Sequence, residues 1–192
     1  IKYPVISHEM GQWCAYPDFD IIDKFTGHME PSNYMVFKES AKKKGVLEQN
    51  KDFVYASGRL QVEMYKEDLE ANFRTPHIYG FELLDLRDYL GQGTALVGIL
   101  DAFWDNKGYV SPEEFRRFCS ETVALLRIEK RVFLNSETIS CPVEISHFGK
   151  TPIKDGTIYW KIESEGKTYK EGNWLVDEIP LGKNIFLGQL EV

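Results

Sequence analysis

The chain has 192 residues, a formal net charge of −7 and a hydrophobic fraction of 43%, which suits one or two globular domains. No run of about 18 consecutive apolar residues occurs, so a membrane span is not expected. The acidic balance argues against a nucleic-acid partner, because such a partner requires a basic face. The three cysteines have no CxxC spacing, so the sequence predicts neither a disulfide framework nor a zinc site.

Residues 1–130 are predicted to alternate short buried strands with helices. The longest helix has apolar residues at a roughly helical period and ends at Thr75-Pro76, because proline disfavours helical geometry in the residue before it. Ser111-Pro112 with Glu114 is a strong helix start. In chain order we expect a strand at 4–7, helices at 20–25, 31–44 and 50–74, a strand at 78–86, a glycine-punctuated loop at 88–94 and a helix at 111–126.

Residues 131–192 are predicted to form strands and turns, which favours an immunoglobulin-like β-sandwich. Five strands are visible where such a sandwich usually has about seven or more, and the chain stops on an apolar strand, so we expect this domain to be truncated. The predicted strands lie at 132–134, 138–148, 157–163, 167–175 and 185–192, with glycine-containing turns between most of them.

Residues 7–13, Ser-His-Glu-Met-Gly-Gln-Trp, are the most informative segment. Glu9 follows a short strand, which is where barrel enzymes place catalytic carboxylates. His8 and Gln12 can donate hydrogen bonds that keep a nucleophilic carboxylate ionised and aimed, and Trp13 can form the wall of a sugar site. The alternative is that Glu9 is an ordinary surface or structural residue of a loop.

Two later segments add candidate binding residues. Asp85 lies near the end of the second predicted strand and Asp88 just after it, where they either bind sugar hydroxyls or form an internal salt bridge, for which Arg74 is a candidate partner. Trp104 either packs over the rim of the fold or stacks on a sugar ring. Residues 105–108 predict a turn and not a calcium loop, and residues 91–93 lack the pattern of a phosphate-binding loop, so no cofactor or metal is expected.

In this order and spacing, these segments resemble glycoside hydrolase family 2, which includes β-galactosidases, β-glucuronidases and β-mannosidases. Ser7-His8-Glu9-Met10-Gly11 is similar to the family's Glu-x-Gly motif, and residues 80–85 are similar to its Gly-Phe-x-x-x-Asp-like segment. Residues 98–101 are similar to the segment that follows the next loop in these enzymes. The resemblance implies that residues 1–130 are the last units of a (β/α)8 TIM barrel and that residues 131–192 begin an immunoglobulin-like sandwich.

The resemblance also implies a function. Glu9 would be the nucleophile of a retaining exo-β-glycosidase, and His8, Trp13, Asp85, Asp88 and Trp104 would bind the carbohydrate substrate. The family's acid/base glutamate lies in an Asn-Glu pair, and this sequence contains no such pair. Since retaining hydrolysis needs two carboxyl groups, we expect the chain to be an inactive fragment of a glycosidase whose acid lies elsewhere.

A non-catalytic carbohydrate-binding or scaffold module is the competing hypothesis, and a structural interaction domain without sugar affinity is a third. Two units cannot close a barrel, which takes about 250 residues. Val5, Phe81, Leu83 and Leu96 would therefore be left exposed, and we expect either self-association through this surface or packing against the rest of a nicked parent protein. The cellular location cannot be read from the sequence; a periplasmic or extracellular parent protein fits these features.

Overall fold

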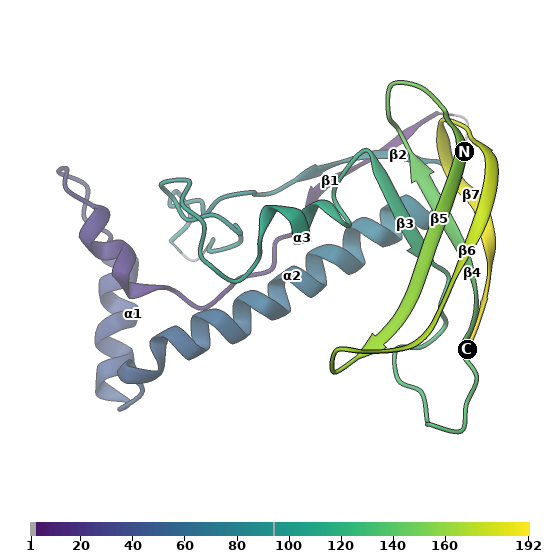
Figure 1. The fold of residues 1–192 in the computed structure, drawn as a ribbon. Helices are drawn as coiled ribbons and strands as arrows, with labels where there is room; N and C mark the ends of the chain where they lie inside the picture. The colour runs from purple at the N-terminus through teal and green to yellow at the C-terminus, as the bar shows by residue number, and fades with distance from the viewer. Residues whose placement is uncertain (1–2, 94) are drawn as a thin grey trace. The chain divides into compact units, whose positions relative to one another are not determined.

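The computed structural model describes residues 3–93 and 95–192. The chain divides into two compact units. The first contains residues 1–72 and 77–116, and the second contains residues 73–76 and 117–192. The described residues form seven strands with few helices, so most of the regular structure lies in small sheets (Figure 1).

The first unit is built on two parallel strands, β1 (Val5–Met10) and β2 (Ile78–Leu83). Parallel strands need a long crossover connection, and here it contains helical segments. They are the 3₁₀ helices η1 (Phe19–Lys24) and η2 (Leu47–Gln49) and the helices α1 (Ser32–Lys43) and α2 (Asn50–Arg74), of which α2 is much the longest (Figure 1).

Helix α2 organises the first unit, because one stripe of its surface is almost fully buried. Val62, Tyr65 and Leu69 are each no more than 1% exposed, and their spacing is that of one helix face. Gln61 lies beside them and donates from its side-chain amide to the carbonyl oxygens of Trp13 and Val97, at 2.5 and 3.0 Å. The helix therefore anchors the loops that follow β1 and β2.

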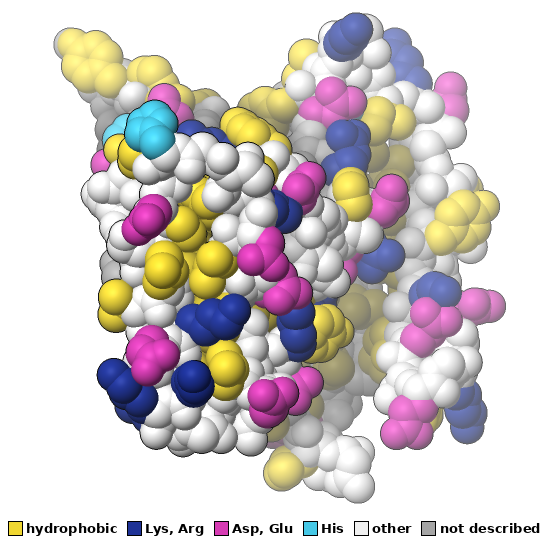
Figure 2. All heavy atoms as spheres, turned by 90° about the vertical axis from the view of Figure 1, so that its left-hand side faces the viewer, with side chains coloured by type: hydrophobic (Ala, Val, Ile, Leu, Met, Phe, Trp, Pro, Cys, Tyr) yellow, Lys and Arg dark blue, Asp and Glu magenta, His cyan; other side chains and the backbone are white. Residues whose placement is uncertain are grey.

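The surface that carries α1 is less polar than a solvated helix face usually is. Met35 and Val36 of α1 are exposed, as is Met29 in the loop before the helix. Figure 2 shows hydrophobic side chains gathered on this side of the molecule, with basic and acidic groups around them.

The second unit contains two antiparallel sheets. One has the order β3-β4-β7, from β3 (Thr122–Leu126), β4 (Ser140–His147) and β7 (Gly182–Glu191). The other is the hairpin of β5 (Ile153–Ser164) and β6 (Lys167–Ile179), whose turn uses the left-handed residues Glu165 and Gly166. Trp160 and Trp174 of the hairpin pack against the core of Cys141, Val143, Ile145, Ile179, Leu187 and Leu190.

The fold predicted from the sequence is wrong. The described residues contain one pair of parallel strands and no barrel of eight β/α units, and the second unit has a three-stranded sheet and a hairpin in place of the predicted immunoglobulin-like sandwich. The physical reason is that a strand, a helical crossover and a parallel strand have the same local pattern in any βαβ unit. That pattern carries no information about how many further units follow or whether they close.

Two local predictions also fail. The helix that starts at Pro112 ends at Arg116 as α3, and residues 122–126 form β3 in place of a continued helix. Val123 and Leu125 are each 1% exposed in β3, which pairs antiparallel with β4, so tertiary burial overrides the helix pattern. Residues 132–134 form no strand. The predicted helix at 50–74, by contrast, is confirmed as α2.

Candidate functional site

The carboxyl ends of β1 and β2 bring three titratable side chains together. The imidazole of His8 lies between two carboxylates: Nδ1 is 3.6 Å from Glu9 Oε1, and Nε2 is 3.2 Å from Glu82 Oε2. Gln12 Nε2 donates to Glu9 Oε2 at 3.0 Å. The side chain of Glu9 is 52% exposed, so its carboxylate is oriented by neighbours and still open to a ligand.

The two faces of this small sheet differ. Ser7 and Met10 face α2, because Asn72 donates from Nδ2 to Ser7 Oγ at 2.7 Å and lies 3.5 Å from the Met10 sulfur. His8 and Glu82 meet on the other face. Glu9 has a φ of 58°, a left-handed conformation that is uncommon for a residue with a side chain, and the β1–β2 register shifts between Ser7 and Met10. The irregular end of β1 thus sets the direction of the Glu9 side chain.

Gly11 and Trp13 continue this strand end. Gly11 has a φ of 87°, and a Cβ atom there would run into the ring of Tyr65, so only glycine fits. The indole Nε1 of Trp13 donates to Asp68 Oδ2 of α2 at 2.8 Å, and the ring is partly exposed. Trp13, which was predicted to form the wall of a sugar site, is therefore held against α2.

Asp85 and Asp88, predicted together, occupy different environments. Asp85 is half-buried and its carboxylate accepts the backbone N–H of Leu86 at 2.7 Å. Asp88 is 2% exposed. Its carboxylate accepts a hydrogen bond from Lys107 Nζ at 2.7 Å and another from the N–H of Gly98 at 3.1 Å. Asp88 therefore takes part in an internal ion pair with Lys107.

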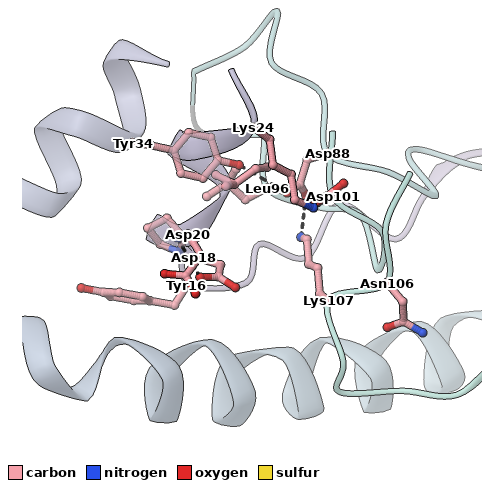
Figure 3. Close-up of a pocket in the computed structure, with 12 residues that line it drawn as sticks. Tyr16, Asp18, Asp20, Lys24, Tyr34, Asp88, Leu96, Asp101, Asn106 and Lys107 are labelled. Atoms are coloured by element: carbon pink, nitrogen blue, oxygen red, sulfur yellow. Dashed lines mark hydrogen bonds and ion pairs between the residues drawn. The ribbon is translucent and has the colours of Figure 1, made fainter. Parts of the chain in front are cut away.

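The Asp88–Lys107 pair lines a small pocket of about 100 Å³. Figure 3 shows Lys107 extending toward Asp88, with Tyr34 and Lys24 among the other residues that line the pocket. Burial raises the pKa of Asp88, against the opposing effect of Lys107, and burial lowers the pKa of Lys107 against the attraction of Asp88. Burial and the Asp88 charge also raise the pKa of Tyr34. The pair is stabilising only as a unit, since either charge alone would be buried without a counterion.

A second ion-pair cluster holds the turn that carries Trp104. Lys24 bonds both Asp101 and Asp105, the latter at 2.7 Å. Burial favours a higher pKa for Asp101, but the hydrogen bonds from Lys24 and from the backbone N–H groups of Asp105 and Phe103 outweigh it and hold the pKa below its ordinary value. Trp104 itself is exposed, with the Arg87 guanidinium 5.5 Å from its ring centroid.

The structure brings some of the predicted site residues together and places others in different surroundings. Glu9 and His8 form one cluster, which adds Glu82 and Gln12. Trp13, Asp85, Asp88 and Trp104 have other contact partners, described above. The sequence did not predict the pairing of Lys107 with Asp88 or that of Lys24 with Asp101. The partners are separated by 19 positions in the first pair and by 77 in the second, and contacts at such separations leave no periodic pattern in a sequence without repeats.

No group of three or more His, Cys, Asp or Glu side chains suited to a metal ion occurs among residues 3–93 and 95–192. None of the helices described is long and apolar enough to cross a bilayer. Residues 137–192 match a family described only as a domain of unknown function, DUF8488. No curated protein matches the chain. The comparisons thus give no support to identifying the chain as a glycosidase.

Proposed function

We propose that Glu9 is the nucleophile in the hydrolysis of a β-linked sugar with retention of configuration, and that this chain supplies that carboxylate without the acid/base group. The observation that supports the proposal most is an exposed carboxylate, oriented by Gln12, at the carboxyl end of a parallel strand pair. Ligand sites in α/β structures lie preferentially beyond the carboxyl ends of parallel strands. The resemblance of residues 7–11 to the Glu-x-Gly motif points the same way.

The chemistry proposed for Glu9 requires an ionised oxygen aimed at a sugar ring. One Glu9 oxygen attacks the anomeric carbon as the glycosidic C–O bond breaks, and water later displaces the carboxylate. Gln12 donates to Oε2 at 3.0 Å and so fixes the orientation of the carboxylate, while Oε1 lies 3.6 Å from His8 Nδ1. His8 also separates the negative charges of Glu9 and Glu82, which favours keeping both carboxylates near one site.

The reaction also needs a general acid that protonates the leaving oxygen. An unactivated leaving group must be protonated as it departs, by a second carboxyl about 5–5.5 Å from the nucleophile. Glu82 is engaged by His8 Nε2, and Asp88 is buried in its pair with Lys107. We therefore expect this chain alone not to turn over ordinary glycosides.

The decisive experiment removes the need for the acid. Dinitrophenyl glycosides that carry fluorine next to the anomeric carbon release a stable phenolate without protonation, and the fluorine slows hydrolysis of the covalent intermediate. The chain is incubated with galactosyl, glucosyl, glucuronyl and mannosyl forms of this reagent. We expect intact-mass spectrometry to show one added fluoroglycosyl group with at least one of them, and peptide mapping to locate it on Glu9.

Two variants give this trapping experiment its controls. Glu9→Gln removes the nucleophile and should abolish labelling. Glu48→Gln changes another exposed glutamate, in η2, and should leave labelling intact. Labelling that persists in Glu9→Gln, or no labelling with any of the four reagents, would overturn the assignment of Glu9 as a nucleophile.

Non-catalytic carbohydrate binding is the second candidate function, and exposed aromatic rings favour it. Trp13 and Trp104 both present part of an indole ring to solvent, and such rings stack on the apolar face of a sugar. Titration of the unmodified chain with the methyl β-glycosides of the same four sugars separates the two functions. Binding that is retained in Glu9→Gln, with no covalent labelling of the wild type, would favour this candidate.

A further inference from the structure

The turn of residues 101–105 carries an exposed tryptophan in an unusual backbone conformation. Trp104 has a φ of 70°, which is a genuine outlier for a bulky side chain, and it is 61% exposed. Neither feature is explained by core packing, because an exposed turn position accepts glycine or asparagine more readily. Residues held in sparsely populated conformations are concentrated at ligand-binding positions.

The surrounding contacts hold this turn in one conformation. The buried Asp101 accepts on Oδ1 from the N–H groups of Phe103 and Asp105, at 2.8 and 3.0 Å. The N–H of Trp104 donates to the carbonyl oxygen of Asp101 at 3.0 Å. Lys24 bonds both Asp101 and Asp105 and so ties the turn to η1. The backbone that positions Trp104 is therefore fixed before any ligand arrives.

The Trp104 indole is also supported by a side chain. The Arg87 guanidinium lies 5.5 Å from the ring centroid, in the range of a cation–π contact. The neighbouring Phe103 packs edge-on against Phe25 of the adjoining loop, with ring centroids 4.9 Å apart. Trp104 thus has one contact that restrains its ring, while more than half of its surface remains open.

We propose that Trp104 is a preformed stacking platform for a pyranose ring and that Lys24 and Asp101 are its positioning residues. The ligand class rests on the function proposed above. A sugar has an apolar C–H face and a rim of hydroxyl groups, so it needs an aromatic surface next to hydrogen-bond donors and acceptors. Arg87 supplies donors beside the ring, and the exposed carboxylate of Asp105 supplies acceptors. The acidic groups of this turn disfavour a nucleic acid, whose phosphates they would repel.

The platform is tested on the full chain by recording the indole N–H signals of ¹⁵N-labelled protein during titration with the four methyl β-glycosides. The Trp104 signal is assigned by its loss in Trp104→Phe. We expect it to shift with at least one sugar and Trp104→Ala to weaken binding about tenfold, whereas Trp104→Phe, which keeps a ring, weakens it less. Tyr159→Ala removes another exposed aromatic ring, on β5, and should leave affinity unchanged.

The positioning role has its own readout. Lys24→Met should weaken sugar binding with Trp104 still present, and Lys24→Arg, which keeps the charge, should restore most of it; thermal unfolding of each variant separates this effect from lost stability. A Trp104 signal that no sugar moves would overturn the platform, even if Glu9 is labelled by the fluoroglycosides. Equal affinity in Lys24→Met and wild type would overturn the positioning role. A shifted Trp104 signal without labelling of Glu9 would keep the platform and reject the nucleophile.

Discussion

At the scale of single residues, the Asp88–Lys107 ion pair lies almost entirely in the interior of the first unit. Their side chains are 2% and 8% exposed, and Lys107 Nζ also donates to the carbonyl oxygen of Gly98 at 2.7 Å. Lys107→Met leaves the Asp88 carboxylate buried without a counterion. We expect it to lower the free energy of unfolding by about 3–5 kcal/mol, measured by urea denaturation at neutral pH.

The loss in Lys107→Met should depend on pH. Burial raises the pKa of Asp88 above its ordinary value of 3.8, and removal of Lys107 takes away the main opposing effect. When folding raises the pKa of an acid, the folded state is favoured at a pH below the pKa of that acid in the unfolded state. This contribution to the free energy of unfolding is lost as the pH rises through the pKa of the acid in the folded state. The loss in free energy of unfolding caused by Lys107→Met should therefore become smaller as the pH falls toward about 4. Asp88→Asn with Lys107→Met is the matched control, and a deficit unchanged by pH would contradict this account.

Much of the candidate site was accessible from single residues of the sequence, but their partners were not. Glu9 stands out because it follows a short predicted strand and lies two residues before a glycine, and the need for a partner at Asp88 follows from its place after a predicted buried strand. The identity of that partner does not follow: Lys107 lies in a turn whose sequence has no feature that links it to residue 88. Pairings across folded loops are set by tertiary geometry, which a single sequence does not encode locally.

At the scale of elements, α2 depends on a glycine that helix propensity alone would disfavour. Gly58 lies in the helix interior, where alanine is intrinsically better by about 1 kcal/mol, but a Cβ atom there would collide with the ring of Tyr109. That ring cannot withdraw easily, because its hydroxyl donates to Gln61 Oε1 at 2.5 Å and lies 3.2 Å from the carbonyl oxygen of Gly98.

Gly58→Ala should therefore destabilise the first unit even though it raises helix propensity. We expect a loss of about 1–3 kcal/mol from overpacking, measured as a lower urea midpoint. Ala56→Gly is the control: it is an exposed position of the same helix, where only propensity acts, so it should cost about 1 kcal/mol or less. A Gly58→Ala variant as stable as the wild type would show that Tyr109 repacks freely.

The difference between local sequence preference and tertiary contacts also explains which elements could be predicted. Helix α2 is long, periodic and bounded by proline, so its limits follow from local sequence. Helix α3 has an equally clear start, but its predicted continuation lies in β3, where Leu125 pairs with Glu144 of β4. A start signal fixes where a helix begins, whereas its end was decided here by strand pairing with residues about twenty positions away in the sequence.

At the scale of the whole molecule, the parallel pair β1–β2 is unusually open. Parallel sheets are normally covered on both faces, and among the described residues β1 and β2 pair only with each other. Asn72 of α2 closes one face, while Ile6, on the other, is 54% exposed and lies over Gly80. The predicted exposure of Leu96 does not occur, since it is 4% exposed within the first unit. The barrel prediction failed at this scale because closure depends on strands that no local pattern specifies.

We expect two copies of the chain to associate through the open face of this sheet, because the exposed side chain of Ile6 would become buried there. Sedimentation velocity over a range of concentrations should show a monomer–dimer equilibrium. Ile6→Lys places a charge on the open face and should shift the equilibrium toward monomer, whereas Val36→Lys on α1, which is 65% exposed, should not. A wild-type chain that remains monomeric throughout would exclude the sheet as a dimer interface, and dissociation by Val36→Lys alone would assign the interface to α1.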